Sequence, residues 1–593
     1  MCGIVGYLGD EDAVPIILES LGRLQYRGYD SAGYATLNVD STLAVRKCLG
    51  PVSNLKTSSQ VDVTSHLGIG HTRWATHGKP TIENTHPLLS CNRDIAVVHN
   101  GVIENHVELR GRLERAGHRF VSETDSEVIP HMLEENVRTG MSFAEAFRLL
   151  PEQLEGSFAI VATSKFLPNL YLVRRGVPLV IGVSDTGYYP ASDIPSFLPY
   201  TTRVVYLKEN ACLEVKSEGI HLISERDGNS SLLDPTEVHV TDESPSEVER
   251  GSFDHFMIKE IYDQGEVIQR ITETPSVELD QLVAATRKAS KVFLVGIGTS
   301  YHSALFLDRL AHLSGVDRFR AVVSSEIEQF ERVLGKDSLV VVISQSGETA
   351  DSISAARIAL KQGADLWGIM NVPVSSLGRL CRGVLPIACG RELAVAATKS
   401  YTAQLSLLVR LLGKYLYREA DSERILKDVV GAIYNLTSVS TRELLQELAR
   451  DLKDCEELFV LGRGLQNVTA REAALKLKEV AGIPAEAFYL GEMKHGPLAL
   501  IHEGSVVMII HGANDKLQAS VAASELQSRG ARILSVGPDR LGSSSWHIQT
   551  CGVGLGSPIT QIIPIQILSY EIAALRGLNP DFPRNLAKSV TVL

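Results

Sequence analysis

The sequence lacks several features that would assign it to a specialised class of protein. It carries a net charge of −12 and shows no Lys/Arg-rich run, so nucleic acid is not expected as a partner. Its evident apolar stretches, such as residues 339–343 and 506–510, have the length of strands and fall far short of a membrane span. The first residues show no basic region followed by a long apolar segment. We therefore expect a cytoplasmic protein that binds neither nucleic acid nor membranes.

The eight cysteines form no CxxC pair and no Cys/His spacing typical of a metal site, so no metal or other cofactor is expected. Seven of them are predicted to be reduced and mostly buried. Cys2 differs because it follows only Met1. Loss of Met1 would leave a residue with both a thiol and an α-amine, and an amine with an ordinary pKa of about 7.7–8.0 can act as base for the thiol. Considered alone, Cys2 is better explained as an accidental buried thiol.

The length of 593 residues predicts two to four domains. Residues 1–240 combine short β-type runs with helical patterns, which predicts layered α+β structure with large sheets. Strands are expected at 3–7, 67–71, 95–99, 158–163, 170–174 and 204–207, and helices at 13–24 and 104–116. Residues 234–252 are polar and acidic and contain two prolines, which indicates a linker.

The remainder of the chain contains a diverged internal repeat. Residues 291–298 resemble 457–464, and residues 337–343 resemble 503–509 at the same offset. Each copy alternates strand, Gly or Ser turn, and helix, which predicts two tandem doubly wound parallel sheets. Ligands of such sheets bind at the carboxyl ends of the strands, where these turns lie.

Three segments near the N-terminus carry side chains suited to binding an amino acid. Arg73 follows an expected strand and could hold an α-carboxylate, and Asp125 could pair with an α-ammonium. Asn100 and Gly101 close another strand with the N–H donors that an oxyanion hole requires. Arg73 in a surface ion pair and Asn100-Gly101 as a simple turn are the structural alternatives.

Two Ser/Thr turns mark the first copy of the repeat. Gly298-Thr299-Ser300 and the run 344–349 (SQSGET) each follow an apolar strand and precede a helical pattern. Hydroxyls and backbone amides at a helix N-terminus suit a phosphate group, although each turn alone could be an ordinary helix cap. The absence of GxxxxGK[ST] argues against nucleotide binding.

With residues 27–33 (RGYDSAG), the N-terminal motifs resemble the N-terminal-nucleophile glutaminase domain shared by several amidotransferases, over about the first 240 residues. The resemblance implies that Cys2 attacks the glutamine amide, that Asn100 and Gly101 stabilise the oxyanion, and that Arg73 and Asp125 hold the amino-acid end. It places further glutamine-binding residues in a loop that closes over the substrate: Trp74, Thr76 and His77.

The paired turns resemble the sugar-isomerase (SIS) domain family, and their position behind a glutaminase resembles the glucosamine-6-phosphate synthase family over essentially the whole chain. The resemblance implies glutamine-dependent conversion of fructose 6-phosphate to glucosamine 6-phosphate, the first step of hexosamine synthesis, with ammonia passing between two sites. The implied sugar-phosphate-binding residues are Thr299, Ser300, Ser344, Gln345, Ser346, Thr349, Val395 and Ala396.

Catalytic residues of the sugar half are expected at three places. Lys476 and Glu479 are three apart in a helical pattern and so share a face, where a solvated ion pair is the alternative to a catalytic pair. The resemblance implies that Glu479 moves a proton between C1 and C2, that His495 opens the ring from a neighbouring subunit of a homodimer, and that Lys588 forms a Schiff base. The chain departs from the family at its last residue, Leu593, where the family has an acidic residue.

The expected boundaries are 2–235 for the glutaminase domain, 236–280 for a linker and lead-in helix, 281–420 and 450–583 for the SIS domains, and 584–593 for a tail. Three alternatives remain: a different sugar-phosphate acceptor, an amino-sugar deaminase, and a sugar-phosphate sensor without turnover.

Overall fold

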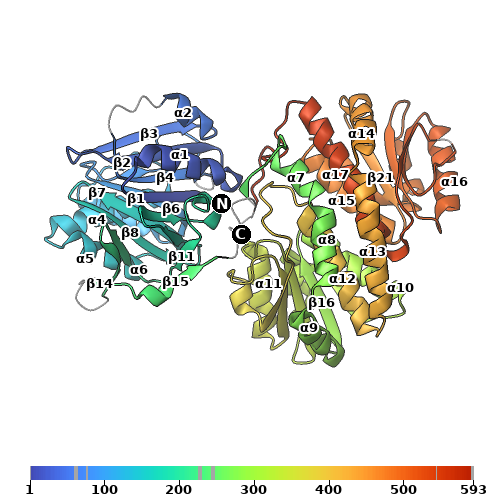
Figure 1. Cartoon of the computed structure of the whole chain (residues 1–593), viewed down its shortest axis with the longest axis horizontal. Coiled ribbons are helices and arrows are strands. Elements are labelled where there is room, and N and C mark those ends of the chain that lie inside the picture. Colours follow the sequence, from blue (N-terminus) through green and yellow to red (C-terminus); the bar gives the residue numbers. More distant parts are fainter. Residues whose placement is uncertain are drawn as a thin grey trace. The chain divides into compact units, whose positions relative to one another are not determined.

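The computed structural model describes residues 2–58, 64–74, 78–224, 230–241, 248–542 and 544–588. The chain forms two compact units, residues 1–249 and residues 250–593, which are coloured blue to green and green to red in Figure 1. Thr76, His77 and Leu593 lie outside the described residues.

The first unit contains two large sheets. The eight-stranded sheet has the order β15-β11-β9-β10-β1-β4-β2-β3, and the seven-stranded sheet has the order β14-β13-β12-β8-β7-β6-β5. The first sheet consists of β1 (Gly3–Gly9), β2 (Ser31–Leu37), β3 (Leu43–Leu49), β4 (Leu67–Arg73), β9 (Val180–Val183), β10 (Gly187–Ala191), β11 (Arg203–Tyr206) and β15 (Val238–Val240). The second consists of β5 (Leu88–Leu89), β6 (Ile95–Ile103), β7 (Gly156–Ser164), β8 (Leu167–Arg175), β12 (Leu213–Lys216), β13 (Gly219–Ile223) and β14 (Ser230–Leu232).

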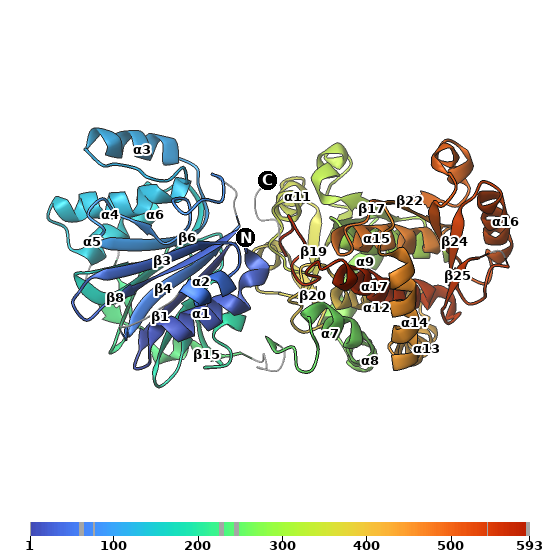
Figure 2. The same cartoon turned by 90° about the horizontal axis from the view of Figure 1, so that it is seen from above.

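Helices cover the outer faces of these sheets, with α1 against the first sheet and α4 against the second, as Figure 2 shows. The helices are α1 (Ala13–Arg23), α2 (Ser53–Ser58), α3 (His106–Arg115), α4 (Val128–Arg138), α5 (Phe143–Arg148) and α6 (Leu150–Gln153). The alternation along β6 builds both layers of core: Ile95 and Val97 pack with the helices, while Ala96 and Val98 pack between the sheets. The predicted layered α+β structure is confirmed, with its layers in the order αββα.

The second unit contains two five-stranded parallel sheets of identical order, β17-β16-β18-β19-β20 and β22-β21-β23-β24-β25. Their strands are β16 (Lys291–Gly296), β17 (Phe319–Val323), β18 (Ser338–Ser344), β19 (Asp365–Met370), β20 (Gly383–Pro386), β21 (Leu458–Gly462), β22 (Ala485–Tyr489), β23 (Val506–Ile510), β24 (Arg532–Gly537) and β25 (Trp546–Gln549). The two sheets confirm the predicted internal repeat of doubly wound parallel sheets.

The repeat extends to backbone conformation. Gly298 and Gly464 precede equivalent helices with the same positive φ of 56°, which only glycine adopts readily. Gly363 and Gly530 end the next equivalent pair of helices, also with positive φ.

Helices surround both sheets of the second unit. They are α7 (Phe256–Tyr262), α8 (Gln264–Glu273), α9 (Val277–Lys288), α10 (Thr299–Leu313), α11 (Ala350–Lys361), α12 (Lys399–Tyr415), α13 (Glu419–Leu436), α14 (Val439–Leu452), α15 (Leu465–Glu479), α16 (Lys516–Gln527) and α17 (Ser557–Leu575). One continuous apolar core includes residues of both sheets and of most of these helices, so the two repeats fold against each other. Whether each repeat is a separate domain with the boundaries given above stays a prediction.

Two details of the fold differ from the sequence-based expectations. Residues 238–240 form edge strand β15 of the first unit, so part of the expected linker belongs to a sheet. Among the described residues, one segment, 554–575, is long and apolar enough to cross a membrane, but 89% of its apolar window is buried in the protein, as in a core helix. Polar residues interrupt its sequence, so it contains no unbroken apolar run long enough to indicate a membrane span.

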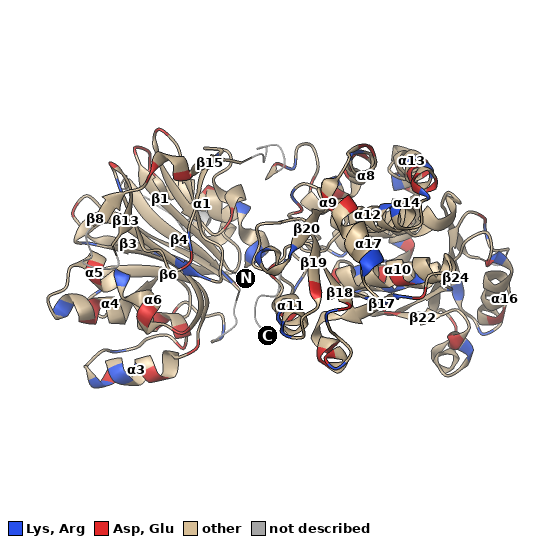
Figure 3. Ribbon diagram, turned by 90° about the horizontal axis from the view of Figure 1, so that it is seen from below, with Lys and Arg blue, Asp and Glu red and all other residues tan. Residues whose placement is uncertain are grey.

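The prediction about cysteine burial is largely wrong. All eight cysteines are free, as expected, but of the seven other than Cys2 only Cys212 and Cys389 are buried. Cys91 and Cys551 are exposed and the remaining three are half-buried. Charged residues of both signs are interleaved over the helices, for example along α3 (Figure 3), in agreement with the absence of a basic run.

Candidate functional sites

The candidate nucleophile lies at the start of β1. Trp74 donates its backbone N–H to Sγ of Cys2 at 3.3 Å, and the thiol contacts the Trp74 carbonyl at 3.5 Å. Burial raises the pKa of the Cys2 thiol, while the Trp74 amide and the positive charge of Arg73 act in the opposite direction. Gly28 lets the preceding loop approach closely, because a Cβ there would lie 2.7 Å from the backbone of Arg73 and Trp74.

Asn100 is next to Cys2, which is the position expected of a residue that stabilises an oxyanion formed by attack of the Cys2 thiol. Its Nδ2 donates to the Cys2 carbonyl at 2.9 Å, and its Oδ1 lies 3.1 Å from Nε2 of His71. Gly101 has a φ of 119°, and a Cβ there would meet the Ser157 carbonyl at 2.0 Å, so only glycine fits. Burial lowers the pKa of His71 to about 3, so this imidazole is neutral and serves to orient the Asn100 amide.

Arg73 and Asp125 belong to the same polar neighbourhood, because the charges of Cys2, Asp30 and Asp125 all act on the Arg73 guanidinium. The guanidinium donates to the carbonyls of Gly78 and Lys79 at 3.1 and 3.3 Å. Asp125 begins the 3-10 helix η2 (Asp125–Glu127), and its Oδ2 accepts the Ile103 N–H at 2.8 Å. The structure thus brings together Cys2, Arg73, Trp74, Asn100, Gly101 and Asp125.

The two predicted phosphate turns lie at the carboxyl ends of two adjacent strands, β16 and β18, of the first parallel sheet. Thr299 begins α10 after β16, and Ser344 ends the adjacent strand β18. The chain passes from β16 to β17 on one side and returns to β18 on the other, so these turns flank the topological switch point.

Most hydroxyls of these turns make local contacts. Oγ of Ser344 and Oγ of Ser346 accept the amides of Gly347 and Glu348 at 3.0 and 3.2 Å. Thr349 caps α11 without a side-chain hydrogen bond. Oγ of Ser300 accepts a hydrogen bond from Gln404 at 3.4 Å, and the backbone carbonyl of Gln345 accepts the Asn371 amide at 3.2 Å.

A buried ionic cluster connects the two repeats through α10 and α15. Nζ of Lys476 is 2.6 Å from Oε2 of Glu479, 3.4 Å from Oε1 of Glu472 and 3.4 Å from Oγ1 of Thr299. Nδ1 of His302 is 2.6 Å from Oε2 of Glu472. Burial alone would lower the pKa of Lys476, but Glu479 and Glu472 outweigh it and raise that pKa, so the ammonium is charged at neutral pH.

Glu472 and His302 were missed by the sequence analysis. Glu472 precedes Lys476 by four residues and therefore shares its helix face, which is a signal that could have identified it. His302 follows Thr299 by three residues on α10, but only the fold brings α10 against α15.

Lys588 contacts a buried carboxylate nearly two hundred residues away. Its Nζ is 2.6 Å from Oε2 of Glu392 and donates to the Ala394 carbonyl at 2.8 Å. Burial would raise the pKa of Glu392, but Lys588 and the amides of Thr398 and Ser400 outweigh it and hold this pKa at about 2. Glu392 was also missed by the sequence analysis.

The segment beside Lys588 contains the expected sugar-contacting residues Val395 and Ala396. The Val395 amide donates to the Asp581 carbonyl at 2.9 Å, and Ala396 is buried. His495 lies instead in the exposed turn between η8 (Glu492–Lys494) and η9 (Pro497–Leu500). Its side chain has no hydrogen-bond or ion-pair partner among the described residues.

Comparison with known proteins agrees with the order of a glutaminase unit followed by paired SIS domains. The pattern of the Glutamine amidotransferase domain matches residues 71–199, and that of the SIS domain matches residues 286–413 and 451–542. The glutamine–fructose-6-phosphate aminotransferase (isomerising) of Pyrococcus horikoshii is 39% identical over all of both chains. The enzyme of the same name from Clostridium tetani is 37% identical, again over all of both chains.

The chain belongs to the family of isomerising glutamine–fructose-6-phosphate aminotransferases. A solved structure supports the same relationship: the C-terminal domain of glucosamine-fructose-6-phosphate aminotransferase from Francisella tularensis covers 56% of this chain and 99% of its own, with 28% identity and a TM-score of 0.52.

Proposed function

We infer that this aminotransferase takes nitrogen from glutamine and converts fructose 6-phosphate to glucosamine 6-phosphate, with release of glutamate. The observation that carries this conclusion is the full-length relationship to enzymes of that name, across a glutaminase unit and a paired SIS unit. The test is to incubate the full chain with both substrates and then omit each in turn. Glucosamine 6-phosphate should form only when both are present, whereas its absence would refute the inference.

In the first unit, the proposed nucleophile is Cys2, and its attack on the glutamine amide forms a thioester and releases ammonia. The Asn100 amide and the Gly101 N–H stabilise the negative oxygen of the intermediate. Arg73 and Asp125 bind the α-carboxylate and α-ammonium of glutamine. For Arg73 this requires exchange of its contacts with the Gly78 and Lys79 carbonyls for the substrate, which would couple glutamine binding to a change in this loop. Trp74, Thr76 and His77 complete the glutamine site in this proposal.

In the second unit, the two turns after β16 and β18 supply the phosphate and hydroxyl contacts of the sugar. Their residues in this proposal are Thr299, Ser300, Ser344, Gln345, Ser346 and Thr349, with Val395 and Ala396 beside the sugar. Amides at the start of α10 and α11 suit a phosphate dianion because both are helix N-termini.

Three further residues are proposed to carry out proton transfer and covalent binding of the sugar: Glu479, Lys588 and His495. Glu479 moves the proton between C2 and C1, and the charged Lys476 beside it fixes the position of its carboxylate. Lys588 attacks the opened ketose at C2 and expels water to form a Schiff base, for which its amine must be released from Glu392 and lose its proton. Ammonia from the first unit then replaces the lysine at C2, which frees Lys588. His495 assists ring opening.

We further propose that the enzyme is a homodimer in which His495 reaches the sugar site of the partner subunit. The exposed position of His495 supports this, because its ring has no partner among the described residues of its own chain. Mixing His495→Ala and Lys588→Ala variants under conditions of subunit exchange should restore synthesis, and continued inactivity of stable mixed dimers would contradict the proposal. The eight free cysteines support a reducing, cytoplasmic location.

A further inference from the structure

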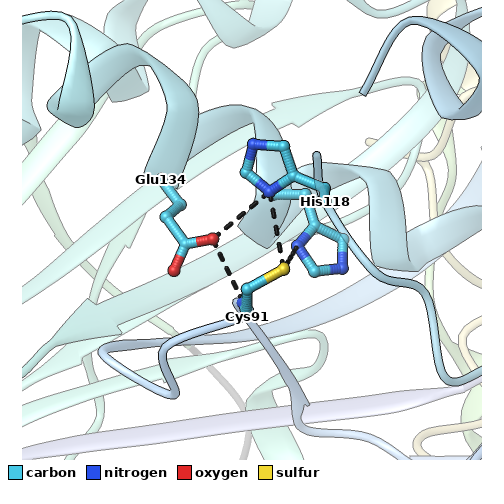
Figure 4. Close-up of side chains that lie close together, drawn as sticks. Cys91, His118 and Glu134 are labelled. Carbon is cyan, nitrogen blue, oxygen red and sulfur yellow. Dashed lines mark hydrogen bonds and ion pairs between the residues drawn. The ribbon is translucent and has the colours of Figure 1, made fainter. Parts of the chain in front are cut away.

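Four potential metal ligands converge in the first unit. Cys91 lies in the turn between β5 and β6, His118 follows α3, and His131 and Glu134 are three residues apart on α4. One ligand atom of each residue lies within 4.8 Å of those of the other three. Figure 4 shows the Cys91 sulfur, His118 and the Glu134 carboxylate directed toward one another.

Three of the distances within this cluster match those around a tetrahedral ion. Sγ of Cys91 is 3.6 Å from Nδ1 of His118 and 3.5 Å from Nδ1 of His131. Nδ1 of His118 is 3.3 Å from Oε2 of Glu134. With bonds of about 2.0–2.3 Å, neighbouring ligands of tetrahedral zinc are about 3.3–3.7 Å apart. Small adjustments would therefore allow all four atoms to bind one ion.

The outer nitrogens of both imidazoles lie beside carboxylates. Nε2 of His118 is 3.1 Å from Oε2 of Glu135, and Nε2 of His131 is 3.5 Å from Oε1 of Glu127. Carboxylates at these positions favour the tautomer that presents a bare Nδ1 to the cluster. The Glu134 carboxylate accepts the backbone amides of Cys91 and Asn92 at 3.1 and 2.9 Å.

An ion has a route to this cluster. A cavity of about 390 Å³ is lined by Cys91, His118 and Glu134, among others. The two imidazoles are buried, whereas Cys91 is exposed. Thiolate and imidazole ligands favour zinc over magnesium or calcium. Four protein ligands leave no open position for a substrate, which is typical of a structural metal site.

We propose that Cys91, His118, His131 and Glu134 bind one zinc-class divalent cation that stabilises the first unit. The ion would tie the turn after β5 and the turn after α3 to α4. This helix directly follows η2, which begins at Asp125, so the site would also support the backbone that carries a candidate glutamine-binding residue. The alternative is a cluster held by its own hydrogen bonds alone.

The test is metal analysis of the full-length enzyme after exposure to zinc and removal of free ions. Wild type should retain one zinc per chain, and Cys91→Ser and His131→Gln should lose it. Cys551→Ser and His312→Gln are matched controls at an exposed thiol and an exposed imidazole outside the cluster, and they should retain it. Cys2→Ala should also retain it, which separates this site from the glutaminase thiol.

Cobalt substitution provides a second measurement, in which the spectrum of wild type itself reports the ligands. Co²⁺-loaded wild type should show thiolate-to-cobalt charge-transfer absorption and the visible bands of a tetrahedral ion, and Cys91→Ser should lack the former. Chelation should lower the unfolding temperature of wild type by about 5 °C and leave Cys91→Ser unchanged. Failure of wild type to retain zinc, or equal retention by wild type and Cys91→Ser, would overturn the proposal without affecting the proposed enzymatic function.

Discussion

Lys476 and Glu479 lie one turn apart on α15, with Nζ of the first 2.6 Å from Oε2 of the second. Lys476 is completely buried and contacts Glu472 as well, so a single ammonium is shared by two carboxylates. Such a cluster is held together strongly, because loss of the ammonium would remove the positive charge that two buried or half-buried carboxylates share. It therefore fixes Glu479 in one position near Thr299, which Lys476 also contacts.

Glu479→Gln should reduce glucosamine 6-phosphate synthesis by about 10²–10⁴-fold, the usual contribution of a general base. The side-chain amide that replaces the Glu479 carboxylate can still accept a hydrogen bond from Lys476, so the fold should be retained. The assay is the rate of product formation, with glutamine hydrolysis as the internal control. Normal synthesis by Glu479→Gln would exclude Glu479 as the base.

Lys476→Met should instead destabilise the second unit by about 3–5 kcal/mol, because it removes one partner of a buried ionic cluster. Chemical denaturation followed by circular dichroism measures this loss. Lys478→Met on the same helix is the matched control. A variant as stable as wild type would show that Glu472 and Glu479 do not depend on this ammonium.

Asn100→Ala should lower kcat of glutamine hydrolysis by about 10²–10³-fold, the cost of removing one oxyanion donor. Synthesis supported by added ammonium should persist, because the second unit is unchanged. A change confined to KM would indicate that Asn100 serves only to hold the Cys2 carbonyl, which it contacts at 2.9 Å.

Lys588→Arg should abolish synthesis while keeping a positive charge for Glu392, because a guanidinium cannot form a Schiff base. Incubation of wild type with fructose 6-phosphate and cyanoborohydride should add the reduced sugar to the peptide that contains Lys588. Mass spectrometry of the digest reads this directly. Labelling of a different lysine would contradict the assignment.

The stability of the second unit should depend on the protonation of Glu260. Burial, and then the neighbouring charge of Glu392, raise the pKa of this carboxyl to about 8. The folded state therefore favours the protonated carboxyl of Glu260. The stability that this carboxyl contributes is complete below its ordinary pKa and is lost as the pH rises through about 8.

Between pH 5 and 8, the free energy of unfolding of wild type should therefore fall by about 1–3 kcal/mol more than that of Glu260→Gln. Urea unfolding at these two pH values compares the variant with wild type, and Glu266→Gln on the exposed side of α8 is the control. An equal decline in wild type and Glu260→Gln would show that the carboxyl of Glu260 does not titrate in this range.

The sequence predicted those features that depend on short-range periodicity. The contact between Lys476 and Glu479 follows from their spacing on a helix, and the equal conformations of Gly298 and Gly464 follow from the repeat. The strands β16 and β21 were recognisable as apolar runs that end in a Gly turn. In each case the information lies in a short segment of sequence or in the similarity between two such segments.

The features that were missed depend on contacts between distant segments. Glu392 and Lys588 are 196 residues apart, and no local pattern pairs them. Cys91 comes within reach of His118 and His131 only because α3 and α4 pack near the turn after β5. A search for regularly spaced Cys and His residues cannot find such a site.

The proposed enzyme moves the amide nitrogen of glutamine onto fructose 6-phosphate. The most direct measurement is mass spectrometry of the product formed from amide-¹⁵N glutamine and fructose 6-phosphate, in buffer that contains unlabelled ammonium. Wild type should yield ¹⁵N-labelled glucosamine 6-phosphate, and Cys2→Ala should yield no labelled product. Glutamine hydrolysis without labelled amino sugar in the wild-type reaction would contradict it.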